Sequence, residues 1–393
     1  MNHLRIGAYF YPITTCCPIR AARAQDHGAS IINEALLAAK GKPLFAGHDQ
    51  PRVSCLGKRT LCEWDDSDPV AMSLQVDLAL EYGIDFWVFT TYIGTKRGTP
   101  YFEMAAPLEQ AFIQSGCGRR LEFAIMAALA SPRAVLPIEP GYVENDRPYD
   151  TNAATARLIV DICARKFWTQ PNYFRIQGRP YLSIFAGDAF PRDVLSYRKN
   201  CQEFFFTVKE YAWREYKTDP YLVGIVREGI SAELLAASGV DALTGYALLP
   251  DWSSTAPPLQ RYWRAFRERE REWPELRKMC VFVPSVSTGW DASARVQCES
   301  AERIFRDIGR FIDAGNGVYP LTPIVIESSA EVFESAFKRT MAFVKREVPT
   351  DEQYGLIFAW NEVTEAPTLL PKITKDGMDF GYLEAVKRVK KQL

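Results

Sequence analysis

The chain has 393 residues, of which 47% are hydrophobic and 24% are charged, an ordinary composition for a globular protein. Its 47 basic and 48 acidic residues give a net charge of −1, so it has no broad positive surface for a nucleic acid, and none is expected as a partner. No apolar run approaches the roughly 18 residues that span a bilayer, so no membrane span is expected. The first residues show no signal segment, which predicts a cytoplasmic protein unless a leader has been trimmed.

Cysteine and histidine usage narrows the possible chemistry. The nine cysteines are odd in number and include no Cys-x-x-Cys pair, which favours buried free thiols in a reducing compartment over a disulfide scaffold. The only histidines are His3, His27 and His48, so a multi-histidine metal site or a histidine-dependent triad would need all its imidazoles from that one segment. Acid–base chemistry in the C-terminal half therefore falls to carboxylates or tyrosines. No motif requires a metal or a cofactor.

The N-terminal part begins with one strand and a long loop. Residues 6–11 form a short apolar run that predicts a buried strand. The irregular stretch from 12 to about 66 follows, and loops of that length are more often functional than neutral. Asp68 and Pro69 then have the residue types of an N-cap and a first helical position, and Gly83 is a typical helix end.

From there strands and helices alternate to the end of the chain. Further strands are predicted at residues 85–92, 122–129, 180–185, 221–226, 242–249, 279–286 and 355–360. Helices are predicted between them at residues 102–115, 152–167, 193–216, 231–238, 258–273 and 328–346. The strands are apolar throughout, as expected where both faces of a sheet are covered.

Eight strand–helix units predict an α/β protein with the (β/α)8 TIM barrel fold. We expect one domain over residues 1–393, with a long loop after the first strand. A doubly wound open sheet is the alternative, but no glycine-rich phosphate fingerprint follows any strand.

In such a barrel the active site lies where the strands end at the carboxyl face. The last predicted strand runs into WNEVTE at residues 360–365, which places Glu362 and Glu365 three residues apart beside the core. Close carboxylates push their pKa values apart, so that one can serve as an acid and the other as a base. These two are the candidate catalytic residues. A solvated loop with two surface acids is the alternative reading.

The remaining strand ends are rich in aromatic and hydroxyl groups and poor in lysine. Such a set suits a neutral, hydroxyl-rich ligand such as a carbohydrate, held by stacking and hydrogen bonds. The candidate substrate-binding residues are Tyr9, Tyr11, His48, Tyr92, Asp188, Tyr246, Trp252, Trp290, Asp291, Trp360 and Asn361.

Several of these residues have structural alternatives. Tyr9 or Tyr11 could belong to the core, and Trp290 could cap the barrel. Asp291 could N-cap a following helix. His48 could act in its loop as a hydrogen-bond donor. The sequence leaves these alternatives open.

Several segments together resemble glycoside hydrolase family 99 and the WbsX-like proteins. KPLFAGHDQPR at residues 42–52 is similar to a WbsX-like stretch. VPSVSTGWD at 283–291 resembles the "PSV-PGY-D" of family 99 and the "PGWD" of the WbsX-like group. WNEVTE at 360–365 resembles their "NEWHEG" and "AWNEWAEG" motifs. The matching segments are spread over residues 5–371, nearly the whole chain.

The resemblance implies a (β/α)8 barrel that acts on glycans. In family 99 the two glutamates of the last motif carry catalysis, and they correspond to Glu362 and Glu365. The resemblance further implies a retaining hydrolase in which Glu362, as a base, helps the 2-hydroxyl of the sugar to form a 1,2-anhydro-sugar intermediate. Glu365 would protonate the leaving oxygen and later activate water. The chain departs from the family motif at Val363, Thr364 and Ala366, so mannan specificity is not carried over.

Two other functions stay open. The WbsX-like resemblance suggests a glycosyltransferase-type role in surface polysaccharide synthesis. Against it, the sequence shows no basic cluster and no glycine-rich loop that would hold a nucleotide diphosphate. The third possibility is a non-catalytic glycan-binding barrel, since a fold does not guarantee a function. All three predict a carbohydrate partner.

Overall fold

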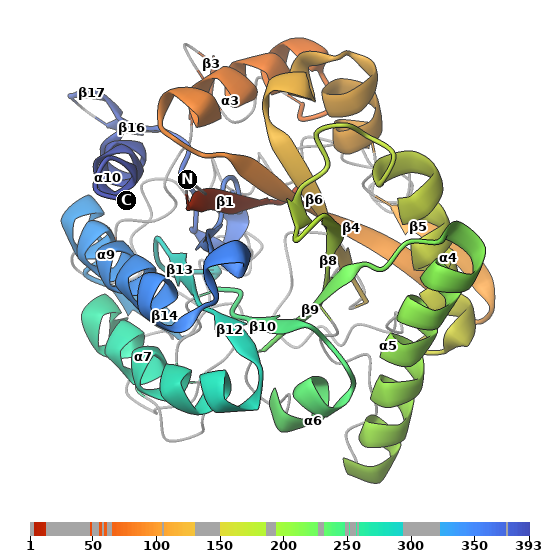
Figure 1. Cartoon of the computed structure of the whole chain (residues 1–393). Helices are drawn as coiled ribbons and strands as arrows, with labels where there is room; N and C mark the ends of the chain where they lie inside the picture. The colour runs from red at the N-terminus through yellow and green to blue at the C-terminus, as the bar shows by residue number, and fades with distance from the viewer. Residues whose placement is uncertain are drawn as a thin grey trace, which may run out of the picture.

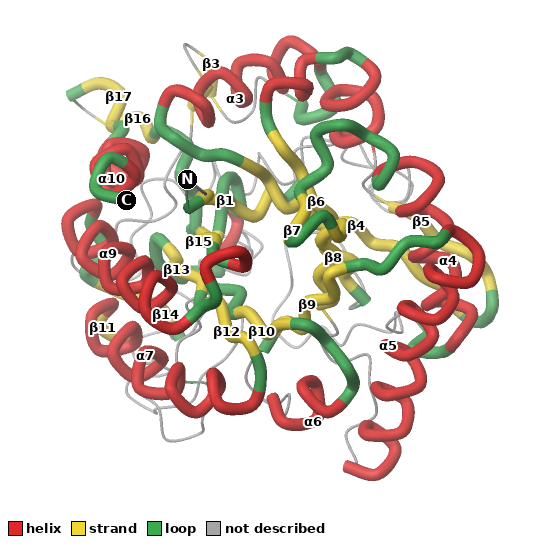
Figure 2. Tube along the Cα trace, in the orientation of Figure 1, coloured by secondary structure: helices red, strands yellow, loops and turns green. Residues whose placement is uncertain are grey.

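The structure is a computed structural model. It describes residues 4–12, 48, 55–56, 59–60, 65–103, 106–129, 150–185, 194–226, 232–247, 251, 257, 259–293, 323–374 and 376–393. Most of the long loop predicted after the first strand lies outside these ranges. The strands gather at the centre of the molecule and the helices surround them (Figure 1, Figure 2).

The central sheet is built from parallel strands in the order β12-β10-β9-β8-β6-β4-β1-β15-β13. The bounds in chain order are β1 (Arg5–Phe10), β4 (Phe86–Lys96), β6 (Glu122–Ala128), β8 (Arg179–Phe185), β9 (Tyr221–Ile225), β10 (Ala242–Thr244), β12 (Val281–Val283), β13 (Ser285–Ser287) and β15 (Tyr354–Phe358).

A single stretch of chain joins the two edges of this sheet. β12 pairs with β10, β13 pairs with β15, and only Pro284 separates β12 from β13. Proline has no N–H to donate to the ladder, so it divides one strand into two. The nine segments of the sheet order therefore fill eight strand positions. The α/β barrel prediction is confirmed, and the open-sheet alternative is wrong.

Helices cover the outside of the barrel (Figure 1). Helices and short helical turns are α3 (Pro69–Glu81), η2 (Pro107–Gln114), η3 (Cys117–Arg120), α4 (Ala153–Ile162), η4 (Cys163–Phe167), α5 (Val194–Tyr216), α6 (Ala232–Ala237), α7 (Tyr262–Met279), α9 (Ala330–Glu347), η6 (Thr350–Glu352), η7 (Val363–Glu365) and α10 (Gly381–Lys390). Asp68 caps α3 as predicted, because its carboxylate accepts the N–H of Val70 at 2.9 Å. None of the helices in the described ranges is both long and apolar enough to cross a membrane.

Short strands account for the main differences from the predicted elements. They pair as β2 (Cys55–Leu56) with β3 (Arg59–Thr60), β5 (Thr99–Glu103) with β4, β7 (Arg175–Ile176) with β8, β11 (Leu259–Arg261) with β14 (Ile324–Ile326), and β16 (Lys372–Thr374) with β17 (Gly377–Asp379). Because residues 99–103 extend the hairpin from β4, the helix predicted from residue 102 begins only at Pro107. Within the described ranges, the cysteines found as free thiols are Cys117, Cys163, Cys201 and Cys280.

Tyrosine rings fill the interior of the barrel. Tyr181 of β8 and Tyr354 of β15 have ring centroids 5.8 Å apart, although three strands separate β8 from β15 in the sheet. Their contact therefore crosses the barrel axis. Nearer the carboxyl ends, the ring of Tyr9 lies edge-on to that of Tyr246 at 5.0 Å. Burial raises the pKa of each of these four phenols above its ordinary value.

The raised pKa values of these phenols predict that the free energy of unfolding falls at alkaline pH. Their folded-state pKa values lie above the unfolded value of about 10, so the stability they contribute is fully present below about pH 10 and is lost as the pH rises further. Urea unfolding across the alkaline range should show a falling free energy, with phenolate absorbance appearing together with unfolding. Tyr9→Phe should make the decline shallower. An unfolding free energy that stays constant through this range would contradict the prediction.

Candidate active site

The site begins where the chain leaves β15. The N–H of Trp360 donates to the carbonyl of Tyr9 at 2.7 Å, and Asn361 forms an isolated bridge with Thr368. The hydroxyl of Thr368 in turn donates to the carbonyl of Trp360 at 3.0 Å. These bonds extend the β1–β15 pairing beyond the strand ends and fix the start of the loop at the carboxyl face.

Trp360 faces away from the barrel mouth. Its ring lies 5.1 Å from that of Trp87, and its indole N–H donates to Gln75 of α3 at 2.9 Å. The side chain is fully buried. The side chain therefore joins the β15 loop to α3, and the substrate-binding role predicted for Trp360 stays a prediction.

The buried side chains of Asn361 and Asp66 extend the hydrogen bonding between the β15 loop and its neighbours. The side-chain oxygen of Asn361 accepts the N–H of Tyr11 at 2.7 Å, and its amide nitrogen donates to Asp66 at 3.3 Å. Asp66 also accepts the side-chain N–H of Gln75 at 2.9 Å. Sequence reasoning missed Asp66 and Gln75, because this network joins segments far apart in the chain. Asn361 thus orients both the β1 and the β15 strand ends.

The next turn is η7, with Glu362 as its N-cap and Glu365 as its last residue. Glu362 is 2% exposed and accepts the hydroxyl of Thr364 at 2.6 Å, whereas Glu365 is only half-buried. Ala366 ends the turn in the left-handed conformation, with φ of 73°. Glycine adopts that conformation most readily, which explains why a glycine suits this position in the similar motifs. The two carboxylates therefore differ in their access to water.

The charges of both glutamates affect the pKa of one phenol, that of Tyr246. The pKa of Tyr246 is raised well above its ordinary value, first by burial and then by the charges of Glu362 and Glu365. Tyr246 follows β10, which only the β12–β13 strand separates from β15 in the closed barrel, and its ring lies 4.2 Å from that of Phe358 at the end of β15. Tyr11 also contributes to this pKa shift, and its hydroxyl lies 3.4 Å from that of Tyr92. Three tyrosines and two carboxylates thus share the mouth.

Tyr9 lies below this mouth. It is fully buried, and its hydroxyl donates to the carbonyl of Gly245 at 3.3 Å. Its burial favours the core alternative for Tyr9, and its contact with substrate stays a prediction.

The loop after β13 brings a third acid to the site. The carboxylate of Asp291 lies 2.8 Å from Nε2 of His48, and its other oxygen accepts the N–H of Ser293 at 2.9 Å. The N–H of Asp291 donates to the carbonyl of Glu365 at 2.9 Å. Trp290 is buried, and its carbonyl accepts the N–H of Val325 at 2.8 Å. Asp291 therefore contacts the turn that carries Glu362 and Glu365 directly.

Comparison with known proteins identifies the chain. The family model described as Glycosyltransferase WbsX matches residues 34–386. The chain belongs to the WbsX family. No curated protein gives a significant match to it.

Solved structures of two proteins resemble this WbsX family member over nearly its full length. The GH99 endo-alpha-mannosidase from Bacteroides thetaiotaomicron is 11% identical, with a TM-score of 0.57, and the match covers 99% of this chain and 97% of that one. A glycoside hydrolase-like protein is 12% identical, with a TM-score of 0.60, covering 99% and 94%. At these identities the likeness shows a shared α/β barrel fold.

Two predicted site residues of this WbsX protein, Asp188 and Trp252, lie outside the described residues. Thr364 and Ser293 were not singled out from the sequence, because short hydroxyl residues in loops carry no distinctive pattern. Among the residues that the structure describes, no group of three histidine, cysteine or acidic side chains could hold a metal ion.

Proposed function

We propose that this protein is a retaining glycoside hydrolase that acts on an oligosaccharide or glycoconjugate, and that residues 1–393 form a single catalytic domain. The observation that carries the proposal is the position of Glu362 and Glu365 in one turn directly after β15, at the carboxyl end of the barrel, beside Tyr246, whose ring lies 4.2 Å from that of Phe358. Active sites in this fold lie at that end. The similar barrels of an endo-alpha-mannosidase and a glycoside hydrolase-like protein support it.

The burial of the two carboxylates suggests how they divide the work. Glu362 is nearly enclosed, and the Thr364 hydroxyl fixes one of its oxygens, which suits a base that must hold one orientation. Glu365 is more exposed, which suits a group that exchanges protons with a leaving oxygen and then with water. We therefore assign Glu362 as the base and Glu365 as the acid/base.

The proposed reaction has two steps. Glu362 removes the proton of the 2-hydroxyl, the freed oxygen attacks the anomeric carbon, and the glycosidic bond breaks as its oxygen takes a proton from Glu365. Water then gives a proton to Glu365 and attacks the anomeric carbon, which opens the 1,2-anhydro ring, and the 2-oxygen recovers a proton from Glu362. Two inversions give net retention. The substrate must carry a free 2-hydroxyl trans to the leaving group.

A panel of aryl glycosides and oligosaccharides tests this proposal. We expect hydrolysis of at least one 1,2-trans glycoside, with a first-formed product of retained anomeric configuration by NMR. The 2-deoxy analogue of the same glycoside should not be hydrolysed, because it lacks the internal nucleophile. Inversion, equal turnover of the 2-deoxy analogue, or no hydrolysis across the panel would contradict the proposal.

A glycosyltransferase role is the second candidate, and the family description favours it. That role requires a nucleotide-sugar or similar activated donor. A donor that binds the folded state raises the melting temperature. At a concentration of a hundred times its Kd, it raises the free energy of unfolding by about 2.7 kcal/mol. Under the hydrolase proposal we expect no shift with common nucleotide sugars. A clear, saturable shift would favour the transferase instead.

A further inference from the structure

His48 and Asp291 form a closed pair beside the catalytic turn. Nε2 of His48 lies 2.8 Å from Oδ2 of Asp291, and the two side chains are 4% and 2% exposed. The residues are 243 positions apart in the chain, so the contact ties the long loop after β1 to the loop after β13. Side chains this enclosed have little surface left for a substrate, so an indirect role fits them better than the direct binding predicted from the sequence.

Both oxygens of the Asp291 carboxylate are used within the protein. Oδ2 faces His48, while Oδ1 accepts the N–H of Ser293 two residues further on. A short polar side chain that binds the backbone ahead of it holds a turn in one conformation. The carboxylate thus fixes the backbone at residue 291 itself, and His48 fixes the carboxylate.

The backbone of Asp291 in turn holds Glu365. Its N–H donates to the carbonyl of Glu365 at 2.9 Å, whereas the bond within the turn, from the N–H of Glu365 to the carbonyl of Glu362, is longer at 3.3 Å. Glu365 belongs to a single helical turn of three residues, which has little rigidity of its own. The contact from the neighbouring strand end is therefore a main determinant of where Glu365 sits.

We propose that the His48–Asp291 pair is a positioning device for the acid/base Glu365. The imidazole of His48 fixes the carboxylate of Asp291, which accepts the N–H of Ser293 and so fixes its own loop. The N–H of Asp291 then donates to the carbonyl of Glu365. This inference rests on the proposed function, since it takes Glu365 as the group that protonates the leaving oxygen. Neither His48 nor Asp291 touches the reacting atoms in this arrangement.

The expected consequence of losing the pair is selective. A misplacement of about 1 Å in a catalytic group costs on the order of 10²-fold in rate. In the first step, a displaced acid harms only leaving groups that need a proton. Loss of the pair should therefore lower kcat/KM, which reports that step, for glycosides with poor leaving groups and spare kcat/KM for those with good ones. A general structural defect would slow both alike.

The test compares His48→Ala with His48→Gln, whose side-chain amide can still donate to Asp291. The substrates are the 2,4-dinitrophenyl and 4-methoxyphenyl glycosides of one 1,2-trans sugar that the wild type hydrolyses. We expect His48→Ala to lose about 10- to 100-fold in kcat/KM on the 4-methoxyphenyl glycoside, with kcat/KM on the 2,4-dinitrophenyl glycoside nearly unchanged. Its kcat on the 2,4-dinitrophenyl glycoside should fall, because the second step also uses Glu365, and added azide should restore it. His48→Gln should restore most of the loss. Equal loss of kcat/KM on both substrates, or no loss on either, would overturn the inference.

A second measurement is independent of activity. The protein has only three histidines, so His3→Ala and His27→Ala assign the imidazole signals in a long-range proton–nitrogen NMR spectrum by elimination. Asp291→Asn should shift the Nε2 signal of His48, and an unchanged signal would contradict the pair. If the wild type hydrolyses nothing, the proposed function fails while this spectrum still reports on the pair. If Glu365→Gln is inactive but His48→Ala cleaves both glycosides at the wild-type rate, the positioning inference alone fails.

Discussion

Glu365→Gln is expected to lower kcat by about 10²–10⁴-fold on a glycoside with a poor leaving group, because general acid–base catalysis contributes about that much. Glutamine has nearly the shape of glutamate but cannot donate a proton to the leaving oxygen or accept one from water. With a 2,4-dinitrophenyl leaving group, the first step needs no acid and the second becomes limiting. Added azide needs no base and should then accelerate turnover and give a glycosyl azide of retained configuration.

Glu362→Gln should behave differently. Without a base for the 2-hydroxyl, the 1,2-anhydro ring does not form, so the loss should be of similar size on good and poor leaving groups. Azide should not rescue it. Steady-state kinetics on the two glycosides, with product analysis by NMR, separate the two variants.

A matched control comes from α10. Glu384 is an exposed glutamate whose nearest cation, Arg388, lies one helical turn away at 3.7 Å. Glu384→Gln should leave kcat and the melting temperature unchanged, because exposed ion pairs contribute little. Wild-type activity in either Glu362→Gln or Glu365→Gln would show that the carboxylate pair is not the catalytic one.

The barrel was predictable because its strands are buried on both faces and therefore read as continuous apolar runs. The seventh strand illustrates the limit of that signal. Residues 279–286 read as one run, yet Pro284 divides it into β12 and β13, which pair with opposite edges of the sheet. Proline is visible in the sequence, but which neighbour each half pairs with depends on closure of the whole sheet.

Helix α7 shows a local rule giving way to tertiary structure. Pro274 predicts a helix end near residue 273, but the helix continues through it to Met279. Trp273 is buried against Phe343 of α9, with ring centroids 5.1 Å apart. Arg339 of α9 also pairs with Glu270 at 2.6 Å. Contacts with α9 therefore hold the helix on both sides of the position that proline disfavours.

The spacing of Glu362 and Glu365 was sufficient to place two carboxylates at the barrel mouth, because strand ends in this fold converge there. The direction of Trp360 was not predictable from that rule, since side-chain alternation stops where the strand ends. The contact between His48 and Asp291 was also not predictable from the sequence, because it joins residues 243 positions apart in the chain. Residues at strand ends were easier to place than the partners that orient them.

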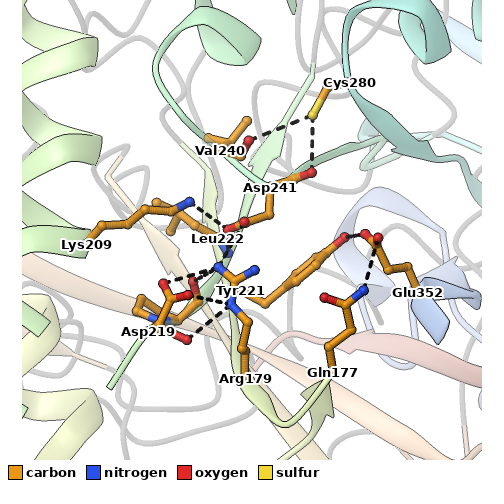
Figure 3. A network of polar contacts seen from close by, with 11 residues as sticks. Gln177, Arg179, Lys209, Asp219, Tyr221, Leu222, Val240, Asp241, Cys280 and Glu352 are labelled. Carbon is orange, nitrogen blue, oxygen red and sulfur yellow. Dashed lines mark hydrogen bonds and ion pairs between the residues drawn. The ribbon is translucent and has the colours of Figure 1, made fainter. Parts of the chain in front are cut away.

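The amino end of the barrel carries a different kind of network, centred on Asp241 (Figure 3). Asp241 precedes β10 and accepts the N–H of Leu222 in β9 at 2.8 Å. Its carboxylate also lies 2.9 Å from a guanidinium nitrogen of Arg179, at the start of β8, and 3.0 Å from Nζ of Lys209 in α5. One mostly buried acid thus joins three strands and a helix. This is the face at which barrel residues serve stability.

Asp241→Ala is expected to lower the free energy of unfolding by about 3–5 kcal/mol, the usual cost of removing one partner of a buried ion pair. The substitution leaves the amide of the fully buried Leu222 without its side-chain acceptor. Among the described residues, the acidic partner left to Arg179 is then the half-exposed Asp219. A domain is stable by about 5–15 kcal/mol, so this loss is a large fraction of the total. Urea unfolding measures it.

The graded variants make this prediction specific. Asp241→Asn keeps an acceptor for Leu222 and should cost less, about 1–2 kcal/mol, while Asp219→Asn should cost under about 1 kcal/mol because that carboxylate is 51% exposed. Hydrogen exchange at the Leu222 amide should quicken in Asp241→Ala and much less in Asp241→Asn. Because Asp241 lies at the end of the barrel opposite Glu362 and Glu365, kcat of the folded variants should stay at the wild-type level. A loss as large in Asp219→Asn as in Asp241→Ala would place the stabilising centre elsewhere in the network.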